Sequence, residues 1–284
     1  MSDTIKTHFC DFPNSGDQLN RLIIKELWGK TIVYSKSTHC ELLGIGSILD
    51  FICRLPDKNL SGKLWSRLRR VLASDAPCHV WSSGFMCYNN ILPIEFIRKN
   101  VVFRAVRGKL SKALAGGIIG APVSCSVFGD GGLLSSLILK KIEKKYPLSI
   151  VPHWREMSDV QILKLLENYR NAHLVDIRKD PMEVISEIAS SDAVLSSSLH
   201  GLVIADSFNI PNRHVIVSKE IKTIQKFKYA DYYSAFDLPH EPVDILSGDS
   251  CPDFNGIIDN YKVSYTSVKE KQNQLILAFP FPER

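Results

Sequence analysis

Short apolar runs alternate with amphipathic segments along the whole chain. Apolar runs bounded by turn residues are typical of strands that are buried on both faces. Segments with apolar residues three and four positions apart are typical of helices that pack on one side. The pattern predicts strands at 7–12, 31–34, 78–85, 100–108, 148–153, 172–178, 193–195 and 213–218, and helices at 17–28, 63–73, 109–114, 133–140, 159–171, 181–190, 199–208 and 265–277.

The alternation of strands and helices indicates βαβ units and parallel sheets. We therefore predict an α/β fold with two Rossmann-like domains that face each other across a cleft. A charged segment at 141–147 suggests domains at 1–145 and 146–284, with the last helix packing back on the first domain. Residues 115–122 are interpreted as a flexible connector. Residues 221–236 are expected to be at least partly helical, and 237–251 to be rich in loops.

Composition narrows the functional classes. The chain has 284 residues, 45% of them hydrophobic, and a net charge of +5 that is spread along the sequence. This indicates no nucleic-acid partner, and the basic stretch 67–70 is interpreted as a solvated helix face. The seven cysteines form no CxxC pair, which is typical of a reduced compartment. No spacing of metal ligands occurs, so we predict neither a metal nor a cofactor, and the sequence indicates no particular oligomeric state.

The N-terminal residues lack the apolar segment of a signal peptide, and no apolar run is long enough to span a bilayer. These features predict a cytoplasmic protein. Contact with the inner face of the membrane stays open, because a substrate could be linked to a lipid.

The segment 192–211 is the strongest candidate for a functional site. An apolar strand ends at three serines, and a helix with apolar spacing follows from Leu199 until Asn209 and Pro211 close it. His200 and Gly201 therefore lie at the carboxyl end of a strand and in the first turn of a helix. Free backbone N–H groups at that edge bind anions. A histidine there can contact phosphate or transfer a proton.

Several other side chains follow predicted strands. Arg107 is a candidate clamp for a carboxylate or phosphate, or else a surface arginine that caps a turn. His153 is a candidate second acid or base, or else a core histidine. Asp17 is a candidate base for a sugar hydroxyl, or else a helix cap. Gly44, Gly46 and Gly84 follow predicted strands, where a glycine allows a ligand to approach the backbone or else serves only a tight turn. Gly131 and Gly132 are candidates for an anion-binding nest at the start of a helix.

An ordered set of motifs resembles the polysaccharide pyruvyl transferase family. The motifs are Asn14-Ser-Gly-Asp17, Gly44-Ile-Gly-Ser47, Trp81-Ser-Ser-Gly-Phe85, Ala105-Val-Arg-Gly108, Gly129-Asp-Gly-Gly-Leu133, Pro152-His153, Asp176-Ile-Arg178, Ser197-Ser-Leu-His-Gly201 and Phe227-Lys-Tyr-Ala-Asp-Tyr-Tyr233.

The resemblance implies a glycosyltransferase-B-like scaffold and transfer of pyruvate from phosphoenolpyruvate to two glycan hydroxyls, in the biosynthesis of exopolysaccharides such as succinoglycan. It implies that His200, Arg107 and His153 are catalytic, and that Asn14, Gly16 and Asp17 line the acceptor side in the first domain. Some relatives carry arginine where this chain has Ser198. That charge must come from elsewhere: Arg107 across the cleft is the leading source, and Lys228 is a further candidate, or else a solvated helix lysine. The remaining predicted substrate-binding residues are Gly44, Gly46, Ser83, Gly84, Gly131, Ser198, Leu199 and Gly201.

Two alternatives compete with this function. The same scaffold would suit a glycosyltransferase that uses a nucleotide sugar, which a nucleoside diphosphate would stabilise. It would also suit a sugar-binding subunit without catalytic activity. The partners expected under the leading hypothesis are phosphoenolpyruvate as donor and a glycan acceptor, free or lipid-linked.

Overall fold

The computed structural model describes residues 3–9, 15–54, 60–86, 95–139, 142–219, 222 and 226–282. The strands in these ranges are β1 (Thr4–His8), β2 (Thr31–Tyr34), β3 (Leu42–Leu43), β4 (Cys53–Arg54), β5 (Cys78–Val80), β6 (Glu95–Phe96), β7 (Val101–Phe103), β8 (Tyr146–Val151), β9 (His173–Leu174), β10 (Ser191–Ser196), β11 (Asn212–Ile216) and β12 (Val243–Asp244). The α-helices are α1 (Ser15–Trp28), α2 (Leu60–Val71), α3 (Lys109–Ile119), α4 (Ser135–Ile138), α5 (Val160–Asn168), α6 (Pro181–Ala189), α7 (Leu199–Ser207), α9 (Lys226–Ser234), α10 (Phe254–Asp259) and α11 (Tyr265–Leu277). The 3-10 turns are η1 (Leu49–Ile52), η2 (Gly131–Leu134) and η3 (Ile245–Ser247).

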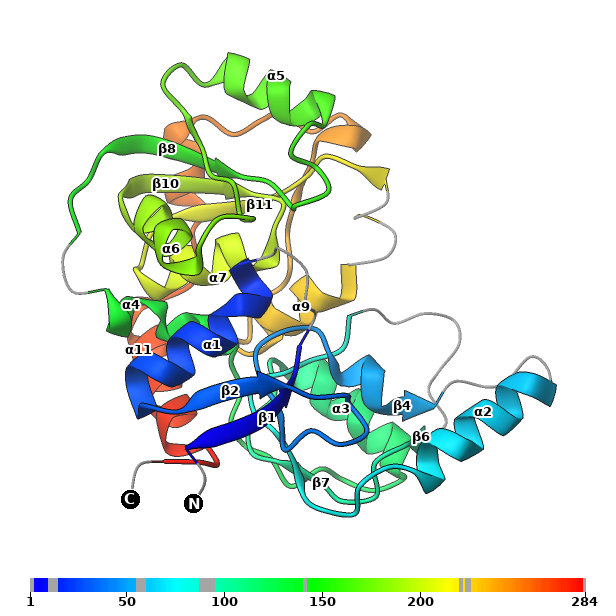
Figure 1. Ribbon diagram of the computed structural model, residues 1–284. Helices are drawn as coiled ribbons and strands as arrows, with labels where there is room; N and C mark the ends of the chain where they lie inside the picture. The colour runs from blue at the N-terminus through cyan, green and yellow to red at the C-terminus, as the bar shows by residue number, and fades with distance from the viewer. Residues whose placement is uncertain are drawn as a thin grey trace.

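Two parallel five-stranded sheets organise the described residues (Figure 1). The N-terminal sheet has the order β2-β1-β3-β5-β7, and the C-terminal sheet has the order β12-β11-β10-β8-β9. In the second sheet Ser196 at the end of β10 pairs with Val151 of β8 on one side and His214 of β11 on the other. The α/β class with two parallel sheets, predicted from the alternating pattern, is confirmed. The division of the chain at residue 145 stays a prediction.

A continuous apolar core joins the two halves of the chain. Helices α1, α4 and α7 lie between the two sheets (Figure 1). Leu19 of α1, Leu133 of η2 and Val203 of α7 are fully buried in one cluster, which also contains Trp81 beyond β5. Separate clusters cover the other faces of the two sheets. The junction between the halves is therefore packed like a protein interior, and the loops at its edge are held in fixed positions.

The C-terminal helix α11 contacts elements from the first half of the chain. The Trp81 indole donates a hydrogen bond to the Leu275 carbonyl at 2.9 Å, and the Phe279 ring stacks on Trp28 with centroids 3.9 Å apart. The helix begins after Ser264, whose hydroxyl accepts from the Ser267 N–H, and its bounds confirm the prediction for residues 265–277.

Some predicted elements were wrong in length or missed. Helix α3 continues to Ile119, through the predicted connector at 115–122, and ends where Gly120 adopts a left-handed conformation with φ of 74°. The predicted helix at 133–140 is instead the 3-10 turn η2 followed by the single-turn helix α4. Strand β12 was not predicted, because only Val243 and Asp244 pair and so short a strand leaves no periodic signal. Residues 10–12 of the first predicted strand lie outside the described residues.

In the part of the chain that the structure describes, no helix has both the length and the apolar character needed to cross a bilayer.

Candidate active site at the junction of the two halves

The turn between β10 and α7 is fixed by a buried serine. The Ser196 Oγ accepts a hydrogen bond from the Ser198 N–H at 3.0 Å and lies 2.8 Å from the carbonyl oxygens of Val151 and Ser198. A Cβ at Gly201 would lie 2.3 Å from this oxygen, so residue 201 must be glycine for the turn to close. The helix α7 starts at Leu199 and ends before Asn209, whose φ of 54° confirms the predicted stop.

His200 lies where the two halves of the chain meet. Its side chain is 13% exposed, and its Nε2 atom is 3.9 Å from the Asp130 Oδ1 atom. On its other side it touches the start of α1, because a Cβ at Gly16 would lie only 1.9 Å from the His200 Nδ1 atom. Burial lowers the pKa of His200. The Asp130 carboxylate raises the pKa and partly offsets the effect of burial, whereas the positive charges of Lys228 and Arg107 lower the pKa further. The imidazole is therefore neutral at neutral pH and able to accept a proton.

Three buried polar atoms around Asp130 and Gly131 have no hydrogen-bond partner among the described residues. They are Nε2 of His200, Oδ2 of Asp130 and Oγ of Ser82. Asp130 uses its other oxygen to accept from the Gly132 N–H at 2.9 Å, and a Cβ at Gly131 would lie 2.8 Å from the Ser82 Oγ. Buried polar atoms without partners are rare and costly in proteins. Their grouping at the end of several strands indicates a binding site for a polar ligand.

The backbone of Ser82 is also unusual. This fully buried residue, just after β5, has a φ of 66°, in the left-handed region that non-glycine residues seldom adopt. Strained residues of this kind cluster at functional sites. Sequence analysis did not single out Ser82 or Asp130, although both belong to motifs that were recognised, Trp81-Ser-Ser-Gly and Gly129-Asp-Gly-Gly.

Lys228 brings a buried positive charge to the same region. Its side chain lies on α9, the residue is 6% exposed, and the ammonium is 5.1 Å from the centre of the Tyr229 ring. Its charge contributes to the lowered pKa of both His153 and His200. The alternative of a solvated helix lysine is therefore wrong for Lys228.

His153 and Glu156 support the turn from the end of β8. The His153 N–H donates to the Ser197 Oγ at 3.0 Å, and this hydroxyl donates to the Glu156 carboxylate at 2.5 Å. Burial, with Lys228, Arg155 and His200, lowers the pKa of His153 to about 3, so its ring is neutral. Burial raises the pKa of Glu156, and the hydrogen bonds from Ser197 and Ser218 lower it by a smaller amount. Sequence analysis missed Glu156, which follows the Pro152-His153 motif without a recognisable signal of its own.

Arg107 is completely buried and bound to the protein itself. Its guanidinium donates to the Asp231 carboxylate at 2.9 Å, to the Ser47 Oγ at 2.5 Å and to the Phe85 carbonyl at 2.5 Å. Asp231 in turn accepts from the N–H and hydroxyl of Ser111. The alternative of a surface arginine is wrong. A direct role in substrate binding stays a prediction, but Arg107 is close enough for its charge to lower the pKa of His200.

The other predicted binding residues are placed as follows. Asn14 lies outside the described residues; Asp17 lies in α1, and only its backbone is described. Several predicted contact glycines pack against the protein itself, since a Cβ would clash with His200 at Gly16, with Asn20 at Gly44, with Arg107 at Gly84 and with Ile45 at Gly131. Gly46 has a φ of 127°, and its carbonyl accepts from the Ser83 hydroxyl at 3.0 Å. Ser198 and Leu199 are buried in the turn before His200.

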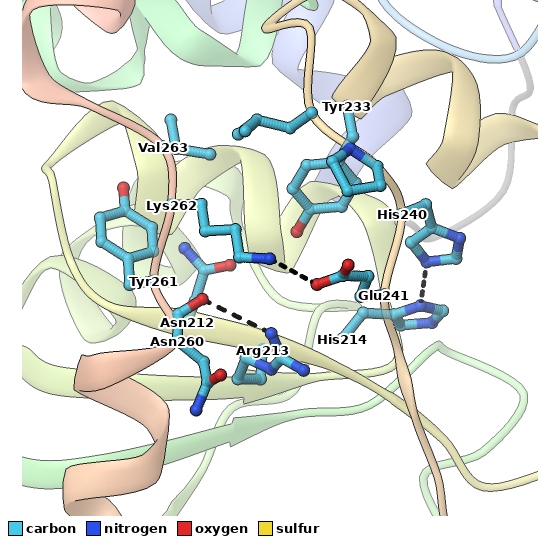
Figure 2. A pocket seen from close by; sticks show the side chains of 12 residues that line it. Asn212, Arg213, His214, Tyr233, His240, Glu241, Asn260, Tyr261, Lys262 and Val263 are labelled. Carbon is cyan, nitrogen blue, oxygen red and sulfur yellow. Dashed lines mark hydrogen bonds and ion pairs between the residues drawn. The ribbon is translucent and has the colours of Figure 1, made fainter.

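A separate pocket lies beside β11 and the loops that precede β12 and α11 (Figure 2). Figure 2 shows a dashed line that joins the rings of His214 and His240. The His214 Nδ1 atom lies 2.8 Å from the His240 Nε2 atom. His214 stacks on Tyr229 with ring centroids 3.9 Å apart, and the Tyr229 hydroxyl donates to the Ser197 carbonyl at 2.7 Å. The aromatic wall of this pocket therefore supports the turn that carries His200.

Comparison with known proteins agrees with the motifs. A family model described as polysaccharide pyruvyl transferase matches residues 14–220. The chain is 27% identical over 232 residues to the succinoglycan biosynthesis protein ExoV of Rhizobium meliloti (strain 1021), covering 81% of this chain but only 63% of that protein. It is 23% identical over 238 residues to the uncharacterized protein L143 of Acanthamoeba polyphaga mimivirus, covering 82% of this chain and 75% of that protein.

The family match begins just before α1 and extends past β11, so it includes α1, η2 and the β10–α7 turn that meet at His200, while α9 with Lys228 lies beyond it. It covers well over half of the chain. The chain therefore belongs to the polysaccharide pyruvyl transferase family.

Proposed function

We propose that the protein transfers the pyruvyl group of phosphoenolpyruvate to two hydroxyls of a glycan, forming a cyclic ketal during the assembly of an extracellular polysaccharide. Membership of the family and the similarity to a protein named for succinoglycan biosynthesis support this proposal. The observation that carries it is the group of buried atoms of Ser82, Asp130 and His200 that have no hydrogen-bond partner among the described residues, in a region where Lys228 supplies positive charge.

Phosphoenolpyruvate carries a phosphate and a carboxylate close together, and its site must offer positive charge and N–H donors. The ammonium of Lys228 and the first turn of α7 supply these in our proposal. Ser198 has no charge to contribute. Arg107 acts through its charge, because its three nitrogens already bind Asp231, Ser47 and Phe85.

The chemical steps need a group that can both accept and return a proton. Neutral His200 accepts the proton of the first sugar hydroxyl as that oxygen bonds to C2, and the imidazolium then delivers this proton to C3, which becomes a methyl group. Asp130 stabilises the imidazolium while it exists. The C2–O bond to phosphate then breaks, inorganic phosphate leaves, and the second hydroxyl attacks C2 to close the ketal and gives its proton to His200. Bound donor anions favour this charged form of His200.

His153 has a different part in this proposal. Because its pKa is lowered to about 3, its ring is neutral and does not act as a general acid near neutral pH. The neutral ring instead orients the donor by hydrogen bonding. The glycan is assigned to the N-terminal side, near the start of α1, where the sequence places Asn14 and Asp17.

The decisive test incubates the purified chain with phosphoenolpyruvate and a panel of bacterial surface glycans. The expected result is release of inorganic phosphate together with an acid-labile pyruvate ketal on one glycan. We expect His200→Ala to reduce kcat/KM by about a thousandfold, the range of general acid–base catalysis. His39→Ala is the matched control, because His39 is exposed and far from the junction in the first half of the chain.

A thermal melt separates the competing functions. Phosphoenolpyruvate should raise the melting temperature of the parent chain, because a ligand that binds only the folded state stabilises it. Stabilisation by a nucleoside diphosphate and not by phosphoenolpyruvate would support a nucleotide-sugar glycosyltransferase instead. The proposed function would be contradicted if phosphoenolpyruvate did not stabilise the chain and no glycan led to phosphate release.

A further inference from the structure

Helix α2 exposes an apolar face that no other described element covers. Its outward residues, with the following Leu72, have exposed fractions of 61% for Leu64, 65% for Trp65, 46% for Leu68, 79% for Val71 and 60% for Leu72. At 3.6 residues per turn these positions share one side of the helix. Figure 1 shows α2 projecting from the body of the molecule, away from the junction. The sequence-based interpretation of 67–70 as part of a solvated polar face is therefore incomplete, because the exposed stripe is apolar.

Basic residues border this stripe on both sides. Arg67 lies along one edge of the stripe and is exposed. Arg69 lies along the other edge, and its guanidinium donates a hydrogen bond to the Phe51 carbonyl at 3.0 Å. Arg70 lies on the opposite side, where it forms an ion pair with Glu95 of β6. The segment from Leu60 to Ala73 contains no acidic residue. The outward surface thus combines large apolar side chains with positive charge only.

This combination matches the surface of an anionic bilayer. A helix that lies in the headgroup region buries an apolar face of leucine and tryptophan, while flanking arginines bind lipid phosphates. A water-exposed stripe of this size would otherwise be unfavourable for a monomeric protein. The side chains of Arg69, at the margin of the stripe, and Arg70, on the opposite side, tie α2 to Phe51 and Glu95, so the stripe is presented from a fixed position.

We propose that α2 docks the protein on a membrane rich in anionic lipids, with Leu64, Trp65, Leu68, Val71 and Leu72 entering the headgroup region. The proposal is independent of the chemistry at His200 and adds to the proposed function a means of meeting a lipid-linked glycan. Its test needs no substrate, so its failure would leave the transferase assay unaffected.

The experiment measures binding of the intact chain to vesicles of phosphatidylcholine with and without phosphatidylglycerol. The emission of Trp65 should shift to shorter wavelength on binding, because Trp65 is largely exposed, whereas Trp28 and Trp81 are buried and Trp154 is partly buried after β8 in the other half of the chain. The chain should float with the anionic vesicles, bind neutral vesicles less well, and lose binding at high salt.

Two variants identify the surface. The double variant Leu68→Ser with Val71→Ser keeps the Trp65 reporter and should weaken vesicle binding about tenfold or more, because it removes apolar area. Arg67→Glu should abolish the preference for anionic vesicles. Leu277→Ser is the control, since Leu277 is 86% exposed but lies at the end of α11.

Two results would overturn the proposal. One is equal binding of the parent and the double variant to anionic vesicles. The other is absence of vesicle binding together with self-association of the parent chain that the double variant abolishes, which would assign the stripe to contact between two copies.

Discussion

At the scale of single residues, Lys228 has the most distinctive environment. A lysine ammonium is strongly hydrated, so burying it in a region with His153, His200 and His214 is costly unless an anion compensates. Glu156 is one anion whose pKa responds to Lys228. In the proposed reaction the donor anions would be others.

Replacing Lys228 by methionine tests this role. Losing one charge-assisted contact to the donor, about 1.5–3 kcal/mol, should raise the KM for phosphoenolpyruvate about tenfold to a hundredfold. The pKa of His153 should also rise from about 3, because the loss of a nearby positive charge makes imidazolium less unfavourable. Steady-state kinetics and NMR titration of the histidines measure the two effects.

Lys226→Met is the matched control for that variant. Lys226 is exposed on the same helix, and its charge lowers the pKa of His240. The control should therefore raise the pKa of His240 and leave the KM unchanged. An unchanged KM in Lys228→Met would remove this lysine from the donor site.

The sequence predicted where His200 lies but not what surrounds it. A strand, a serine turn and an apolar helix locate His200 at a sheet edge from local pattern alone. Its contacts with Gly16 and Asp130 join segments that are distant in the sequence, and only the packing of α1 and η2 brings them together. The same limit applies to Arg107, whose partner Asp231 lies in the other half of the chain.

At the scale of secondary-structure elements, the contact of α1 with α7 sets the position of the imidazole. The first turn of α1 approaches His200 so closely that residue 16 has no room for a methyl group. Elements with a strong local signal, such as α1 and α11, were predicted within a few residues. Helix α3 was predicted too short, because Gly116 and Gly117 suggest a break but helix packing tolerates both. Tertiary contacts outweigh such weak local preferences.

Gly16→Ala should therefore reduce activity strongly while the chain stays folded. A Cβ at residue 16 would displace the His200 ring, and small displacements of a catalytic group can cost about a hundredfold in rate. Phosphate release measures the activity, and urea unfolding measures the stability.

Gly117→Ala provides the comparison for that variant. No atom lies within 4 Å of a Cβ at Gly117 in α3, so alanine should stabilise the chain by about 0.5–1 kcal/mol and leave activity unchanged. Full activity in Gly16→Ala would show that the α1–α7 contact does not position His200.

At the scale of the whole molecule, two ion pairs join α9 and the turn that follows it to residues at and before the start of α3. Arg107 and Asp231 form a pair with no exposed surface, and Gly84 and Gly108 pack so tightly against it that a Cβ at either would clash. Lys109 and Asp237 form a second pair at the same interface, but both are well exposed. Burial therefore distinguishes two otherwise similar contacts between the halves of the chain. The buried pair is one of the contacts, together with the shared apolar core, that hold α9 against the first half of the chain.

Asp231→Asn should expose this difference in an unfolding experiment. It leaves the Arg107 charge buried without its counterion, which typically costs about 3–5 kcal/mol, so the urea midpoint should fall markedly. Asp237→Asn should leave the midpoint unchanged, because an exposed ion pair contributes little and asparagine tolerates the φ of 59° at that position.

Saturating phosphoenolpyruvate adds a second readout. If Arg107 acts only through its charge, the ligand should bind Asp231→Asn without restoring the lost stability beyond the shift seen in the parent. Full restoration would mean that the freed guanidinium binds the donor directly, and a midpoint equal to that of the parent would show that the pair does not hold the two halves together.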